Sequence, residues 1–255
     1  MTDTAATRFE IGRVIGNTFE VLGRNFVPFI LVALALSGIP AFVLQMLSFS
    51  SGGFSAAHSL LSLVFMLIRA VLAFVLQGAL VAGAISSLNG NRIDLGAMLS
   101  RGASAALPLF GLAILEGLGL VLGFVLLIVP GLILATVWSV AVPALVVEQT
   151  GVFGAFTRSG DLTRGRRWSV FGLLVIYAVL AWIVSAIGTA VVMGLGGGIS
   201  AMAVAGAPSF PLAIFSAIVA TLLGALSASG GAALYYELRL TKEGVAPQAV
   251  FDTFS

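Results

Sequence analysis

Residues 59–86 read SLLSLVFMLIRAVLAFVLQGALVAGAIS and contain one charged side chain, Arg69. A helix needs about 20 predominantly apolar residues to cross the roughly 30 Å hydrocarbon core of a bilayer, and this stretch is longer than that. It therefore predicts a transmembrane helix.

The composition extends this interpretation to the whole chain. Hydrophobic residues make up 60% of the 255 positions and charged residues 9%, whereas a soluble domain carries roughly 25% charged residues. We therefore expect a single integral membrane domain over residues 1–255, with the bilayer as its solvent. Apolar runs of suitable length predict six spans: 26–48, 59–86, 107–129, 131–147, 168–194 and 210–236.

The fourth predicted span is short, and Pro130-Gly131 leaves almost no loop between it and the third. These two spans could form a re-entrant pair or a tight hairpin. Their combined length is enough for two crossings, which favours the hairpin.

Basic residues outside the spans alternate along the chain. The loops at 49–58, 130–131 and 195–209 have no Lys or Arg, and the other segments carry Arg8, Arg13, Arg24, Arg92, Arg101, Arg158, Arg164, Arg166, Arg167, Arg239 and Lys242. The positive-inside rule places these segments, and with them both termini, in the cytoplasm. The first 25 residues are polar and lack the features of a cleavable signal peptide, so the first span is expected to remain as an anchor.

The predicted fold is an all-α polytopic bundle of about six transmembrane helices, arranged as three hairpins with short amphipathic helices on the cytoplasmic side. Small residues four apart, as in Gly119-x-x-x-Gly123 and Gly78-x-x-x-Ala82, allow helix backbones to approach closely.

Two ionisable residues lie inside predicted spans. Arg69 is ten residues into the second span from outside, and Glu116 is nine residues into the third from the cytoplasm. At 1.5 Å per residue, both are about 15 Å deep. A charge at this depth is costly, so we expect an intramembrane ion pair between them. The pair would either hold the helices in register or form a polar point on a substrate or proton path.

The segment from Gly151 to Trp168 is too polar to span the membrane. Its apolar and basic residues predict a surface element, with a short helix near 152–159 that Gly160 and Gly165 interrupt. Its arginines either orient the fifth span or contact anionic phospholipid headgroups. The candidate contacts are Arg158, Ser159, Thr163, Arg164, Arg166 and Arg167.

Residues 130–168, PGLILATVWSVAVPALVVEQTGVFGAFTRSGDLTRGRRW, resemble a bacterial inner-membrane family. The motif comprises the Pro-Gly-Leu-x-Leu-x-x-x-Trp-x-x-Ala-x-Pro run, Val147-Glu148, Arg158-Ser159 and the basic turn before Trp168. The family includes the membrane domain of some glycerophosphoryl diester phosphodiesterases and the YciC-type inner-membrane proteins. The resemblance implies a helix bundle in the bacterial inner membrane with no agreed activity. It does not imply phosphodiesterase activity, which belongs to a separate soluble domain.

The residues argue against catalysis. The chain has one His, no Cys and ten acidic residues, with no pairs at catalytic spacing. We therefore expect that the protein is not an enzyme and that it binds no metal, cofactor or nucleic acid. The expected role is a scaffold or accessory protein that interacts with the lipid bilayer, as a homo-oligomer or with another membrane protein. The alternative is a transporter or lipid-handling protein with a polar site at Arg69 and Glu116, near the middle of the membrane.

Overall fold

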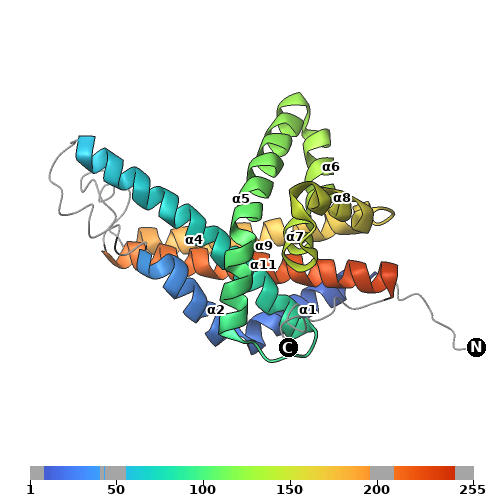
Figure 1. The fold of residues 1–255 in the computed structure, drawn as a ribbon, viewed down its shortest axis with the longest axis horizontal. Helices are drawn as coiled ribbons and strands as arrows, with labels where there is room; N and C mark the ends of the chain where they lie inside the picture. The colour runs from blue at the N-terminus through green and yellow to red at the C-terminus, as the bar shows by residue number, and fades with distance from the viewer. Residues whose placement is uncertain (1–8, 41–42, 44–55, 196–209, 245–255) are drawn as a thin grey trace, which may run out of the picture.

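The computed structural model describes residues 9–40, 43, 56–195 and 210–244. Within these ranges all regular elements are helices, so the expected all-α class is confirmed. Figure 1 shows their arrangement. In chain order they are α1 (Ile11–Arg24), α2 (Phe26–Ala33), the π-helix η1 (Leu34–Gly38), α4 (Ala56–Leu88), α5 (Leu95–Leu126), α6 (Ile128–Trp138), α7 (Ala141–Glu148), α8 (Gly151–Thr163), α9 (Arg167–Leu195) and α11 (Phe210–Glu243).

The six predicted spans are confirmed only in part. Among the described residues, four helical stretches are long and apolar enough to cross a membrane: Leu63–Leu88, Leu95–Leu126, Ile128–Glu148 and Arg167–Val191. A fifth is counted if α1 and α2–η1, which meet at an angle of 72°, form one broken span. The predicted span 210–236 lies within α11 but is not among these stretches. Most of the predicted loops 49–58 and 195–209, and the end of the first span, lie outside the described residues.

Helix α1 is amphipathic, and short amphipathic helices beside the spans were expected from the sequence. Val14, Thr18 and Val21 recur at helical spacing and are buried, and α1 packs along α11. The bend into α2 occurs at Asn25, whose side-chain amide donates to the Val21 carbonyl and to the Ser87 hydroxyl at the end of α4. These bonds hold the bend against α4.

Helices α4 and α5 cross where two glycines meet. A Cβ on Gly78 would lie 3.0 Å from the Gly102 Cα, and a Cβ on Gly102 would lie 2.2 Å from the Val75 carbonyl oxygen. The Phe74 and Phe110 rings pack edge to face at 5.7 Å beyond this crossing, and the two helices then diverge (Figure 1). The close approach expected at Gly78-x-x-x-Ala82 is thus confirmed.

The turn between α5 and α6 lies at Leu127, and not at Pro130-Gly131 as predicted. Leu127 is the single residue between the two helices, and its backbone is extended (φ −166°, ψ 151°). Pro130 instead lies in the first turn of α6, where its missing N–H costs no helical hydrogen bond. Gly123 and Gly131 then bring the two backbones together, with 3.0 Å from the ideal Cβ of Gly123 to the Gly131 Cα. The two helices lie side by side (Figure 1). The expected arrangement of all spans as three hairpins is not confirmed.

The surface segment forms a longer helix than predicted. Helix α8 runs from Gly151 to Thr163, so Gly160 lies inside it and does not interrupt it. Gly165, with φ +85°, lies in the turn that follows. A helix tolerates an interior glycine at a cost of about 1 kcal/mol when neighbouring turns are packed. Leu162 and Ala155 supply that packing, since both side chains are buried.

The buried core lies toward one end of the helices. In α4 the fully buried side chains fall between Ala79 and Ser87, and in α5 most fall between Met98 and Leu112. They pack with α7, α8 and the second half of α11 into one hydrophobic cluster. The opposite halves of α4 and α5 leave large apolar side chains exposed.

Candidate functional site

A cluster of polar side chains joins α7, α8 and α11 next to the core. We call Glu148, Arg158, Tyr235, Arg239 and Glu243 the ion cluster. The Arg158 Nε donates to both carboxylate oxygens of Glu148 at 2.8 Å, and its Nη2 lies 2.5 Å from Glu243 Oε1. The Tyr235 hydroxyl donates to Glu148 Oε1 at 2.6 Å. Arg239 completes the ring by donating from Nε to Glu243 Oε2 at 3.0 Å.

A turn with unusual backbone geometry brings the first two members together. Gln149 adopts left-handed geometry (φ 53°) and Gly151 has φ +73°. These two residues reverse the chain between α7 and α8, so that Arg158 on α8 returns to Glu148 at the end of α7. Ser159 holds the same helix from its other side, because its hydroxyl donates to the Val137 carbonyl and accepts from the Val140 amide.

The cluster is electrically balanced, with two carboxylates and two guanidinium groups. Burial alone would lower the pKa of Arg158, but hydrogen bonds and charge attraction from Glu148 and Glu243 raise it above its ordinary value. Burial alone would raise the pKa of Glu243, whereas hydrogen bonds from Arg158 and Arg239 hold it below its ordinary value. The opposite charges of the ion cluster therefore stabilise one another.

A second ion pair joins α1 to α11. The Arg13 Nε and Nη2 lie 3.0 Å and 2.8 Å from Glu237 Oε1. The Glu237 side chain is fully buried, and its Oε2 has no hydrogen-bond partner among the described residues. One fully buried carboxylate thus depends on an arginine that comes from the opposite end of the sequence.

Most of the predicted headgroup contacts are engaged inside the protein. Arg158 belongs to the ion cluster, and Ser159 and Thr163 are buried and bonded within the helical framework. Arg166 donates to the Thr241 hydroxyl and stacks 6.0 Å above the Phe9 ring. Only Arg164 and Arg167 of the six are exposed.

The expected ion pair between Arg69 and Glu116 is not formed in the described part of the chain. Arg69 is exposed on α4, and Glu116 is half-buried on α5. The prediction placed the two residues at matching heights on antiparallel helices, which agrees with the observed contacts of Gly78 with Gly102 and of Phe74 with Phe110. The α4 and α5 ribbons diverge away from their crossing, however (Figure 1), and we attribute the missing ion pair to this divergence.

Sequence reasoning missed the ion cluster and the Arg13–Glu237 pair. Glu148 and Tyr235 are separated by 87 positions, and Arg13 and Glu237 by 224. No local spacing signals such contacts. The one usable signal was charged residues at the ends of apolar runs, which require partners when they are buried.

The family model for a domain of unknown function, DUF7847, matches residues 54–238. The chain belongs to the DUF7847 family. The DUF7847 match contains Glu148, Arg158, Tyr235 and Glu237, but ends before Arg239 and Glu243. It does not link the chain to the phosphodiesterase membrane domain or to the YciC-type proteins, so that resemblance stays a prediction. Neither the curated proteins nor the solved structures gave a significant match.

Proposed function

We propose that the protein is a non-enzymatic scaffold or accessory protein of the bacterial inner membrane, which contacts lipids and the transmembrane helices of partner proteins. One observation carries this proposal. Charged side chains next to the core form ion pairs with one another in the ion cluster and between Arg13 and Glu237, whereas large apolar side chains remain exposed on the outer halves of the helices.

The exposed apolar surface is concentrated where α4 and α5 diverge. On α5 the exposed side chains include Leu118, Leu122 and Val125, and on α4 they include Met66 and Leu67. A monomeric soluble protein rarely exposes apolar patches of this extent. In a bilayer, such a surface packs against lipid chains or against apolar faces of other helices.

The paired carboxylates support a structural role over a catalytic one. Glu148, Glu237 and Glu243 are each held by at least one arginine. A carboxylate held in this way contributes to the stability of the fold, and its hydrogen-bonding capacity is occupied by protein groups and not offered to a substrate.

The transporter alternative relied on Arg69 and Glu116. These two residues form no pair in the described ranges, and neither lines the cavity between α9 and α11. No observation favours this alternative over the scaffold.

Photocrosslinking in living cells tests the scaffold proposal. A photoreactive residue at Leu122, which is 61% exposed on α5, is expected to give discrete adducts with one or a few membrane proteins. The same residue at Leu112, which is buried on the same helix, is the matched control and should give none. Adducts with lipid alone from Leu122 would contradict the scaffold role.

The distribution of basic residues supports an orientation with both termini in the cytoplasm. The contacts of Arg13 with Glu237 and of Arg166 with Thr241 bring three basic segments together at one end of the bundle. These are the N-terminal segment, the segment around α8 and the end of α11. A reporter that is active only in the cytoplasm should therefore be active when it is fused after Ser255, and a reporter that is active only in the periplasm should be inactive there. A periplasmic signal from this fusion would contradict the orientation.

A further inference from the structure

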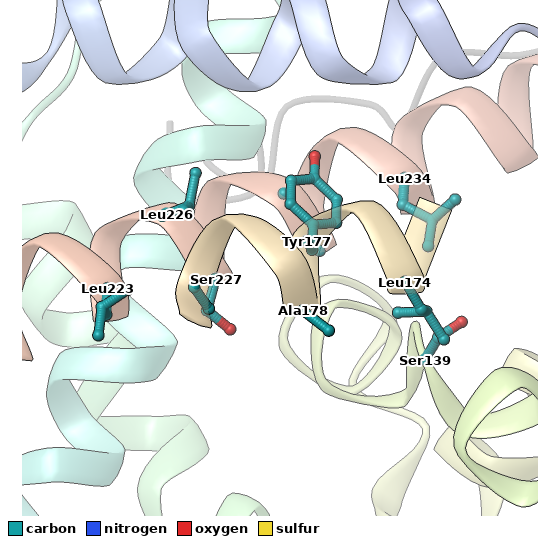
Figure 2. Close-up of a pocket in the computed structure, with 11 residues that line it drawn as sticks. Ser139, Leu174, Tyr177, Ala178, Leu223, Leu226, Ser227 and Leu234 are labelled. Carbon is teal, nitrogen blue, oxygen red and sulfur yellow. The ribbon is translucent and has the colours of Figure 1, made fainter. Parts of the chain in front are cut away.

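A cavity of about 420 Å³ opens between α9 and α11, with Ser139 from the α6–α7 junction at one wall (Figure 2). Leucine and alanine side chains line most of it, including Leu174 and Ala178 from α9 and Leu223 and Leu226 from α11. Its size lies within the usual range of small-molecule sites, roughly 300–1,000 Å³. An apolar lining of this kind is suited to hydrocarbon.

Glycine and alanine residues in the wall leave this space open. A Cβ on Gly231 would meet no heavy atom within 4 Å, although Gly231 lines the cavity. At Gly230, by contrast, a Cβ would lie 2.8 Å from the Tyr177 ring. Figure 2 shows the Tyr177 hydroxyl directed away from the cavity toward α1, where it shares a hydrogen bond of 2.6 Å with Thr18. Tyr177 is thus a fixed wall, and the volume beside Gly231 is free.

A cation lies on the same face of α9 as the cavity. Arg167 precedes Leu174 by seven residues, Ala178 by eleven and Ala181 by fourteen. At 100° per residue these intervals return close to one direction, and seven residues correspond to about 10 Å along the axis. A molecule that lies along this face would therefore have one end at Arg167 and the other in the cavity.

The arginines at this end of α9 are available to a ligand. Arg164 and Arg167 are exposed, and neither side chain has an ion pair or a hydrogen bond among the described residues. Trp168 beside them is 87% exposed and packs edge to face on Phe171. An exposed Trp next to arginines at the end of an apolar helix is typical of the headgroup layer of a membrane.

We propose that this cavity binds one acyl chain of an anionic phospholipid, whose phosphate lies against Arg167 and Arg164. The proposal rests on the proposed function only in taking the protein to lie in a bilayer. The apolar cavity would hold the acyl chain, and Arg167 and Arg164 would bind the negatively charged headgroup. About 10 Å along α9 separates Arg167 from the cavity residue Leu174, which suits a molecule with a polar end and an apolar tail. Neutral lipids would enter the same cavity with lower affinity.

The test measures how much phosphatidylglycerol and phosphatidylcholine the purified protein retains in detergent, by native mass spectrometry. Gly231→Leu fills the cavity and should reduce retention of both lipids at least fivefold. Gly224→Leu is the matched control, because its Cβ also meets open space on α11 but Gly224 does not line the cavity. Ala181→Leu fills the cavity from the opposite wall and decides the matter if Gly231→Leu does not fold.

Arg167→Gln tests the headgroup contact separately. Loss of one basic contact at a membrane surface should weaken phosphatidylglycerol binding about fivefold and leave phosphatidylcholine unchanged. The loss should shrink at high salt, because exposed charges are screened. Arg92→Gln makes the same charge change in the exposed α4–α5 loop and should bind both lipids as the parent does.

Parental retention by folded Gly231→Leu or Ala181→Leu would overturn the acyl-chain site, and parental binding by Arg167→Gln would overturn the headgroup contact. Failure of the scaffold role would appear instead as missing protein adducts at Leu122 on α5, a helix that does not line the cavity.

Discussion

We expect Arg13→Met to lower the free energy of unfolding by about 3 kcal/mol, the lower end of the usual cost of breaking a buried ion pair, because the Arg13 side chain is itself 34% exposed. The reason is the carboxylate that is left behind. Glu237 is fully buried, and Arg13 is the cation that holds its Oε1. Without Arg13, the Glu237 carboxylate would remain in the core without its cation. Leaving a buried charge unpaired costs free energy.

The double change Arg13→Met with Glu237→Met should recover much of that loss, because two apolar side chains of similar volume can replace a buried pair at little cost. Unfolding in detergent, followed by the helical circular dichroism signal, measures each term. Arg24→Met is the matched control on the same helix. Its partner Glu20 is 61% exposed, so the loss should be below about 1 kcal/mol. Damage in the double variant equal to the sum of the single variants would show that the two groups do not interact.

We expect Gly102→Ala to destabilise the α4–α5 crossing by about 1–3 kcal/mol, the range for inserting a methyl group into a packed interface. The added Cβ would lie 2.2 Å from the Val75 carbonyl oxygen and 2.9 Å from the Ala79 amide nitrogen. Both are backbone atoms, so relief requires the two helices to move apart. That movement would also disturb the Phe74–Phe110 contact.

Gly117→Ala on the same helix is the control. A Cβ there meets nothing within 4 Å, so only the gain in helix propensity remains, up to about 1 kcal/mol in favour of the variant. The same unfolding measurement compares the two variants. Equal stability of Gly102→Ala and the parent would show that the helices do not approach as closely as the structure has them.

The sequence predicted the helical elements well where the signal was local. The stretch 59–86 falls within α4, and 168–194 falls within α9. Alternation of basic and uncharged loops identified the segments that later proved to meet at one end of the bundle. Small residues four apart correctly indicated the close approaches at Gly78 and Gly123. Each of these signals lies within a few turns of one helix.

The errors arose where the outcome depended on two helices at once. Arg69 and Glu116 were expected to pair because their depths matched, but depth does not determine the distance between helix axes. That distance depends on the glycine contact at Gly102 and on the divergence beyond Phe110. Arg158 was assigned to lipid headgroups because no local pattern indicated a protein partner. Its partner Glu243 lies 85 positions away in the chain.

Hydrophobicity, helix length and the placement of charge therefore determined from sequence alone that this is an all-α protein with helices able to span a membrane. They could do so because each is a property of neighbouring residues in one chain segment. Tertiary structure decided which charges neutralise one another, which arginines remain exposed at the start of α9, and where a cavity remains between α9 and α11. These outcomes depend on packing between helices that are distant in sequence. Gly102 allows the α4 and α5 backbones to approach closely, and Gly231 leaves open volume beside α11.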